Sequence, residues 1–279
     1  MQPLRKAVGT ARPVMAGASA LAISNLSVRF GARTILDATN FDVREGEFLC
    51  IVGSSGSGKT TLLRVIAGLA RPAEGKILFS GVEISGPSRD RAIIFQDYSK
   101  ALLPWRTVRG NIALSLEARN VPAAEQDAII DGLLGKMGLR AAKEQFPGQL
   151  SGGMQQRVQI ARCLAQDPKL LLMDEPFGAL DAMTRQTLQD EILQLVSEKQ
   201  IATVFITHDL EEAIYLGDRV LVLGGSPARI RETIEIDLPR PRNQLTTRED
   251  QRFLAYRHRL FELLVHERSR LTSQSEGQG

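Results

Sequence analysis

Short, uniformly apolar runs alternate with longer amphipathic segments over most of the chain. Runs of four to seven residues without a period of two are typical of strands buried on both faces of a parallel sheet. The longer stretches between them, such as Thr184–Lys199, place apolar residues at helical spacing. This alternation predicts an α/β fold with a parallel sheet. The predicted core strands are Phe48–Val52, Ala92–Phe95, Lys169–Met173, Ile201–Thr207 and Arg219–Leu223.

Three other regions depart from this pattern. Leu21–Val43 reads as two antiparallel strands around a turn at Gly31, which predicts a β subdomain. Helical patterns between residues 101 and 165, with Pro122 at a helix start, predict an inserted α-helical subdomain. Residues 1–20 are small and basic and are expected to be a disordered extension. The main domain is thus expected at 21–240, and 241–279 is expected to be a helical tail.

Composition is that of an ordinary globular protein. Of 279 residues, 43% are hydrophobic, and no apolar run approaches the ~18 residues of a membrane span. The formal net charge of +3 is small for this length and does not favour nucleic-acid binding. Cys50 and Cys163 lie in apolar surroundings and are expected to be small buried residues. Arg240 and Arg242 form a short charge run of the kind that is usually solvated surface.

A phosphate-binding motif follows the first core strand. Residues 53–60 match G-x-x-x-x-G-K-[ST] and stand between a strand and a predicted helix. In this motif the glycines let backbone amides turn toward the β-phosphate, Lys59 reaches the β/γ-oxygens, and Thr60 offers its hydroxyl to Mg²⁺. A flexible Gly/Ser loop without this function would not need the lysine. The expected nucleotide-binding residues here are Gly53, Ser54, Ser55, Gly56, Ser57, Gly58, Lys59, Thr60 and Thr61.

Polar residues also follow three other core strands. Gln96, Asp174 and His208 each stand at the carboxyl end of an apolar run, as Gly53 does. Singly, a glutamine after a strand or an isolated histidine usually has no catalytic role. Ligands of open α/β sheets bind at this edge, however, so the four together predict a site for a Mg²⁺–nucleoside triphosphate. Asp174 suits Mg²⁺, and the adjacent Glu175 suits a base that activates water.

The stretch from Leu150 to Asp181 adds a second phosphate-directed device. Ser151, Gly152 and Gly153 precede a predicted helix, and a helix N-terminus with bare glycine amides favours an anion. The apolar positions of that helix lie on one face, and the strand after it ends in the Asp174–Glu175 pair. The helix-face residues are Met154, Val158, Ala161, Leu164 and Ala165.

These motifs resemble those of ABC-type ATPases, from about Ile23 to Arg242. The resemblance implies a P-loop NTPase core of RecA-like type, Mg²⁺ and ATP as cofactors, and a head-to-tail homodimer. In such a dimer Ser151 and Gly152 would close over the γ-phosphate held by the opposite subunit, and Asp181 would communicate between the sites. Gly153, Gln155 and Asp181 are further expected nucleotide-binding residues. It also implies that Phe30 stacks on adenine, that Gln96 contacts Mg²⁺ and the attacking water, and that His208 binds the γ-phosphate. Lys59, Gln96, Glu175 and His208 are then the expected catalytic residues.

The same resemblance indicates a bacterial importer. The chain would lie on the cytoplasmic face of the membrane, bind membrane-spanning permease subunits, and cooperate indirectly with an extracytoplasmic solute-binding protein. Leu102–Trp105 resembles a variant found in importers for nitrate, taurine and alkanesulfonates. Two alternatives remain: a soluble ABC ATPase acting on DNA or ribosomes, and a P-loop kinase. A long coiled-coil insertion or a second ATPase half would favour the first, and the residues 150–157 disfavour the second.

Overall fold

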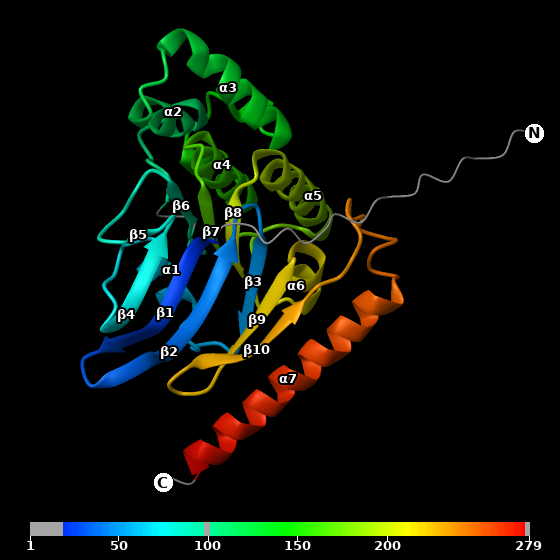
Figure 1. Ribbon diagram of the computed structural model, residues 1–279. Coiled ribbons are helices and arrows are strands. Elements are labelled where there is room, and N and C mark those ends of the chain that lie inside the picture. The colour runs from blue at the N-terminus through cyan, green and yellow to red at the C-terminus, as the bar shows by residue number, and fades with distance from the viewer. Residues whose placement is uncertain (1–18, 98–100, 277–279) are drawn as a thin grey trace, which may run out of the picture.

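The computed structural model describes residues 19–97 and 101–276, and its strands form two sheets (Figure 1). The larger sheet has the order β10-β9-β3-β8-β7-β6, and its neighbours are parallel except for β10 with β9. Its strands are β3 (Phe48–Gly53), β6 (Arg91–Ile94), β7 (Leu170–Asp174), β8 (Ala202–Ile206), β9 (Arg219–Gly224) and β10 (Arg229–Glu235). The five apolar runs are therefore neighbours in one sheet, as predicted.

The second sheet is antiparallel and has the order β2-β1-β4-β5. Its strands are β1 (Ser19–Phe30), β2 (Arg33–Arg44), β4 (Glu74–Phe79) and β5 (Val82–Glu83). The first two form the predicted hairpin, and Phe30 pairs with Arg33 across its turn. Because β1 begins at Ser19, the last two residues of the expected extension belong to a strand. The rest of that extension lies outside the described residues.

The helices form two groups. The larger sheet is accompanied by α1 (Lys59–Ile66), α5 (Ala182–Lys199), α6 (Leu210–Leu216) and α7 (Gln251–Glu276). A helical lobe, at the top of Figure 1, lies between β6 and β7 in the sequence, close to the expected 101–165. It contains α2 (Val108–Ala118), α3 (Ala123–Lys136), α4 (Gly152–Ala165) and two single 3₁₀ turns, Arg140–Ala142 and Pro147–Gln149. Local capping sets its boundaries: the Thr107 hydroxyl accepts a hydrogen bond from the Gly110 amide at the start of α2.

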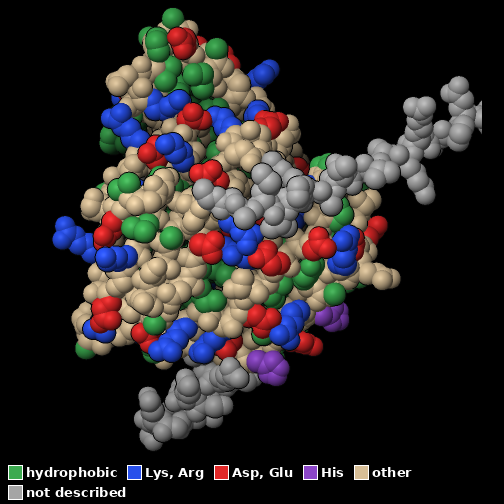
Figure 2. Space-filling view, viewed as in Figure 1, with side chains coloured by type: hydrophobic (Ala, Val, Ile, Leu, Met, Phe, Trp, Pro, Cys, Tyr) green, Lys and Arg blue, Asp and Glu red, His purple; other side chains and the backbone are tan. Residues whose placement is uncertain are grey.

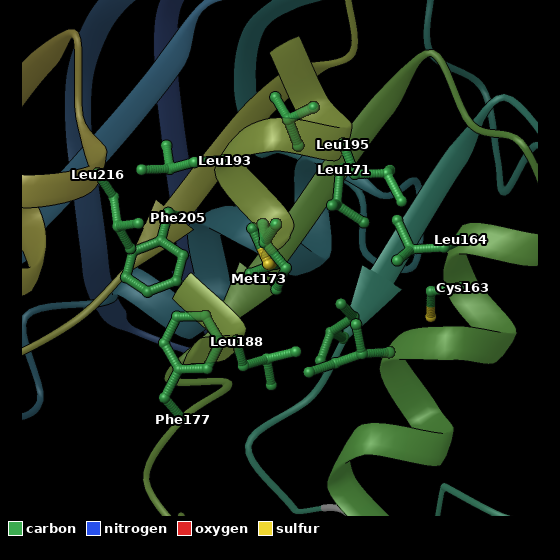
Figure 3. Packing of buried hydrophobic residues seen from close by; sticks show 14 of the residues in the cluster. Cys163, Leu164, Leu171, Met173, Phe177, Leu188, Leu193, Leu195, Phe205 and Leu216 are labelled. Carbon is green, nitrogen blue, oxygen red and sulfur yellow. The ribbon is translucent and has the colours of Figure 1, made fainter. Parts of the chain in front are cut away.

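Burial on both faces explains why the core strands are uniformly apolar. Along β7, Leu171 and Met173 pack into the hydrophobic cluster that includes the helical lobe, whereas Leu170 and Leu172 pack into the cluster beneath the second sheet. Figure 3 shows the first cluster, in which Met173 lies near Phe205 of the neighbouring strand. Successive side chains of a strand point to opposite faces, so a strand between two cores is apolar at most of its positions.

Charged side chains of both signs are mixed on the surface. On the face shown in Figure 2, Lys and Arg side chains are interspersed with Asp and Glu.

Both cysteines are buried, as the sequence predicted. Cys50 and Cys163 are free thiols, and burial raises the pKa of Cys163 to about 11. Among the helices of residues 19–97 and 101–276, none is long and apolar enough to span a membrane.

The short charge run at Arg240 and Arg242 is not merely solvated, and this expectation from the sequence was wrong. The Arg242 guanidinium donates to the carbonyl oxygens of Ile214 (3.1 Å) and Tyr215 (2.6 Å) at the end of α6. Arg240 donates to the Asp218 carboxylate at 2.6 Å. Cations are favourable at a helix C-terminus, where carbonyls have no intrahelical partner. The two arginines therefore fasten the C-terminal segment to α6.

Replacing Arg242 is expected to lower stability. Arg242→Met keeps the length of the aliphatic stem but leaves two helix-terminal carbonyls without their donor. We expect the free energy of unfolding to fall by about 1–3 kcal/mol. Denaturant unfolding followed by circular dichroism measures the change, with Arg71→Met, an exposed arginine after α1, as the control. Equal stability of the two variants would contradict this role.

Candidate functional site

A pocket of about 560 Å³ lies at the carboxyl edge of the parallel strands. It combines the loop between β3 and α1 with residues that follow β6, β7 and β8. Residues from the start of β2 form another part of its wall. Its lining residues are Arg33, Ile35, Gly53, Ser55, Gly56, Ser57, Gly58, Lys59, Thr60, Thr61, Gln96, Asp174, Glu175 and His208.

The phosphate-binding loop is shaped by two glycines that tolerate no side chain. A Cβ on Gly53 would lie 2.2 Å from the Leu223 carbonyl oxygen of the adjacent strand. Gly58 caps α1 at φ 83°, and a Cβ there would lie 2.8 Å from Ile35. Lys59 is 8% exposed, and its ammonium donates to the carbonyl oxygens of Gly53 and Ser54, both at 2.8 Å. The loop thus holds a buried cation inside its own turn, where phosphate oxygens could replace the carbonyls.

Gly53→Ala is expected to damage this loop. The added methyl group meets a backbone oxygen that is fixed by the pairing of β3 with β9, so neither atom can move without disturbing the sheet. We expect a loss of about 1–3 kcal/mol in stability together with weakened ATP binding. Thermal unfolding and a nucleotide-binding titration measure both effects. Gly86→Ala is the control, because a Cβ there contacts nothing within 4 Å; similar behaviour of the two variants would refute the steric argument.

Asp174 and Thr60 form the part of the pocket that fits Mg²⁺. The Asp174 carboxylate is 4% exposed and is hydrogen-bonded to the Thr60 side chain. Burial raises its pKa, which Thr60 partly offsets. Among the described residues no three His, Cys, Asp or Glu side chains form a metal cluster. One carboxylate and one hydroxyl suit Mg²⁺, which takes few protein ligands and completes its shell with phosphate oxygens and water.

Glu175 lies at the centre of a polar group beside this acid. Its Oε2 accepts a hydrogen bond from Gln96 Nε2 at 2.9 Å and lies 3.2 Å from His208 Nδ1. Its backbone has φ 46°, the left-handed region, and its amide donates to the Ile206 carbonyl at 3.0 Å. A non-glycine residue held in this conformation is uncommon and is found at functional sites. The structure therefore brings Gln96, Glu175 and His208 into direct contact, although they come from three loops.

Several residues expected at the nucleotide are not part of this pocket. Ser151 caps α4 by accepting from the Met154 amide, and the Gln155 side chain donates to the Pro147 and Leu150 carbonyls. Asp181 caps α5. Gly152 and Gly153 begin α4, and Phe30 is 59% exposed at the end of β1. Within one chain none of the six lines the pocket.

The sequence reasoning missed Arg33 and Ile35, which line the pocket from β2. They also line a smaller hollow of about 200 Å³ with Ser54, and with Gly225 and Ser226 after β9. The only feature of the sequence that could have indicated a role for Arg33 in phosphate binding is its positive charge, two residues after Gly31. This charge indicates a role in the pocket only once the structure shows that the hairpin packs against the phosphate-binding loop, where Ile35 approaches Gly58.

Comparison with known proteins agrees with this geometry. Residues 36–178, about half of the chain, match the family model described as ABC transporter. An uncharacterized ABC transporter ATP-binding protein of Methanocaldococcus jannaschii is 49% identical over 83% of this chain and 85% of its own length. The nitrate import ATP-binding protein NrtC of Synechococcus elongatus is 45% identical over 85% of this chain, and the bicarbonate transport ATP-binding protein CmpC of the same organism is 46% identical over 75%. This chain covers 36% and 32%, respectively, of those two proteins.

A solved structure supports the same assignment. The dimeric ATP-binding cassette MJ0796, in a post-hydrolysis state bound to ADP and Pi, superposes with a TM-score of 0.71 at 29% identity. The match covers 77% of this chain and 98% of that one. The fold predicted from the sequence, a P-loop NTPase core with an antiparallel β subdomain and a helical subdomain, is therefore confirmed. The chain belongs to the ABC transporter family, as an ATP-hydrolysing subunit that uses ATP with Mg²⁺ and couples its hydrolysis to transport.

Proposed function

We propose that this chain powers an importer for a small anion from the cytoplasmic face of the cell membrane. It would act with membrane-spanning permease subunits and, through them, with an extracytoplasmic solute-binding protein. The observation that carries the proposal is the pocket in which the P-loop, Gln96, Asp174, Glu175 and His208 meet. Four separate strands supply these groups, and each group answers one need of Mg²⁺–ATP hydrolysis.

Each pocket residue has a distinct proposed role. Lys59 and the P-loop amides bind the β- and γ-phosphates, while Thr60, Asp174 and Gln96 would hold Mg²⁺, which supplies charge neutralisation when bound. Glu175 accepts a proton from the water whose oxygen attacks the γ-phosphorus. The bond from that phosphorus to the β–γ bridging oxygen breaks, and the products are ADP and inorganic phosphate. The contact of Glu175 with Gln96 holds the carboxylate oxygen in place. His208 would donate a hydrogen bond to the γ-phosphate.

We further propose that the site is completed by a second copy of this chain. The residues from Ser151 to Gly153 present a helix N-terminus outside the pocket of their own chain, and a helix N-terminus attracts anions. In a head-to-tail pair they would face the nucleotide of the partner, with Gln155 bracing the loop and Asp181 at the contact between the sites. Phe30, exposed beside Arg33, would stack on adenine. The dimeric state of MJ0796 supports this arrangement.

The cargo is proposed to be a nitrate-like anion. Relatives named for nitrate import and for bicarbonate transport are almost equally similar to this chain, so similarity supports the class of small anions rather than one member. The resemblance of Leu102–Trp105 to the variant of nitrate, taurine and alkanesulfonate importers supports a cargo of that group. Trp105 is 72% exposed on the helical lobe, which would face the permease. The alternative of a soluble ABC ATPase acting on nucleic acid or ribosomes has no comparable support.

The proposal is tested in a strain that lacks the gene for this chain. We expect the strain to fail on nitrate as sole nitrogen source, or on taurine or an alkanesulfonate as sole sulfur source. The wild-type chain should restore growth and Glu175→Gln should not. Glu125→Gln, which changes an exposed carboxylate on α3, is the control and should restore growth. Normal growth of the deletion strain on all three sources, with unchanged uptake of labelled nitrate and bicarbonate, would refute the proposed cargo class.

A further inference from the structure

A chain of hydrogen bonds joins the C-terminal segment to the residue before His208. Gln244 Nε2 donates to Gln189 Oε1 at 3.3 Å, and Gln189 Nε2 donates to Glu212 Oε1 at 3.1 Å. The other oxygen of Glu212 accepts from the Thr207 hydroxyl at 2.7 Å. The four residues, here named the relay, come from the segment before α7, from α5, from α6 and from the position directly after β8. Separate parts of the chain are thus linked through side chains.

The inner members of the relay are buried. Thr207 and Gln189 are each 1% exposed, and Glu212 is 6% exposed. Burial raises the pKa of Glu212, and the hydrogen bonds from Thr207 and Gln189 oppose that effect. Hydrogen bonds of buried polar groups are strong and hard to replace, because no water can substitute for a lost partner. The relay is therefore a defined polar connection within an apolar core.

Thr207 connects the relay to the backbone around His208. Its hydroxyl oxygen also accepts a hydrogen bond from the Asp209 amide at 3.0 Å. This bond joins the residue before His208 to the residue after it. The Thr207 amide donates to the Ile51 carbonyl of β3, the strand that leads into the P-loop. The His208 side chain is 73% exposed and reaches only the Glu175 carboxylate among the contacts described. Its placement consequently depends on the backbone beneath it.

We propose that Glu212 and Gln189 are positioning residues that hold His208 at the nucleotide site, and that Gln244 makes the C-terminal segment part of this device. The proposal rests on the role proposed above for His208. It predicts that weakening the relay lowers the rate of hydrolysis of bound ATP while ATP affinity is kept, because the P-loop is not touched. A displacement of about 1 Å at a reacting group can reduce the rate by ~10²-fold.

An exchange of the two buried side chains tests the inner relay in the full chain. In Glu212→Gln one of the two acceptor oxygens becomes an NH2 group, so position 212 can accept from Gln189 or from Thr207 but not from both. We expect kcat to fall by about tenfold or more, with KM for ATP unchanged. The double variant Gln189→Glu with Glu212→Gln restores every donor–acceptor pair, because the amide introduced at position 212 can still accept from Thr207 and can donate to the carboxylate introduced at position 189. We expect it to recover most of the lost turnover. The melting temperature of each variant shows whether a lower kcat comes from loss of folded protein or from displacement of His208 in a folded chain.

Gln244→Met tests the outer relay without changing a buried charge. Methionine keeps the shape of the side chain but cannot donate to Gln189, nor to Asp190 Oδ1 (2.8 Å) and the Gln186 carbonyl (3.2 Å), which the same amide also contacts. We expect kcat to fall by roughly three- to tenfold, the effect of about one ordinary net hydrogen bond. The matched control is Gln194→Met on α5, whose amide bonds the exposed Glu198. The proposal is supported if Gln244→Met is slow and Gln194→Met is not.

His208→Ala distinguishes the failure of this proposal from the failure of the role on which it rests. Full hydrolysis in His208→Ala would refute the role of His208, and the relay with it. Loss of hydrolysis in His208→Ala, with wild-type kcat in folded Glu212→Gln and in Gln244→Met, would overturn the relay alone. Failure of the exchange variant to recover turnover, although its melting temperature is normal, would also overturn it.

Discussion

Glu175→Gln should bind ATP as the wild-type chain does and hydrolyse it about 10²–10⁴-fold more slowly. The amide has the size of the carboxylate and can still bond Gln96, but it cannot take a proton from water. The Glu175 carboxylate lies between Gln96 and His208 and contacts both. Its backbone lies in the left-handed region, and its amide is bonded to the Ile206 carbonyl. The change therefore removes a proton acceptor and leaves the pocket in place.

Phosphate release at saturating Mg²⁺–ATP and ATP affinity measured by titration are the two readouts. Glu125→Gln serves as the control for an exposed carboxylate and should leave both unchanged. Retained ATP binding with undiminished hydrolysis would show that Glu175 is not the base. Loss of ATP binding would instead assign the carboxylate to the structure of the pocket.

Lys59→Met should weaken ATP binding by roughly 10- to 150-fold, as expected for hydrogen bonds to a charged group worth about 1.5–3 kcal/mol. The Lys59 ammonium is buried and is the P-loop's own cation. Burial lowers its pKa, while Glu175 and Asp174 raise it. Without the ammonium the two carboxylates remain at the same edge of the sheet and would repel the phosphates of ATP.

A titration of nucleotide at fixed Mg²⁺ measures the affinity of Lys59→Met. Lys76→Met, which changes an exposed lysine of β4, controls for the loss of one positive charge. Melting temperatures without nucleotide show whether the loop survives, since the methionine also removes two bonds to the Gly53 and Ser54 carbonyls. Equal affinities of the two variants would mean that the phosphates bind elsewhere.

The central sheet and its polar edge could be predicted from the sequence because burial leaves a direct signal. Strands that pack on both faces are mostly apolar, and β7 shows both faces at Leu171 and Leu172. The carboxyl ends of parallel strands meet at one edge, so residues as distant in sequence as Gln96 and His208 were expected near the P-loop. The short β5 and the seven-residue α6 gave no comparable pattern.

The remaining features depend on tertiary contacts that no local pattern contains. Arg33 enters the pocket only because the β1–β2 hairpin packs against the P-loop. Arg242 looked like a surface charge because its partners are the main-chain carbonyls of Ile214 and Tyr215, which no sequence pattern marks. The relay was missed for the same reason, since its glutamines and its glutamate resemble ordinary helix surface residues. Ser151 was expected at the nucleotide of the opposite subunit and Asp181 between the two sites, and both stay predictions; in one chain they are helix caps.

Sedimentation velocity of the Glu175→Gln chain, with and without Mg²⁺–ATP, tests the central claim most directly. The account predicts monomers without nucleotide and a dimer with it, because each ATP would lie between the P-loop of one copy and the Ser151–Gly153 loop of the other. Lys59→Met in the same background should stay monomeric at the same ATP concentration. A chain saturated with ATP that still sediments as a monomer would contradict the account.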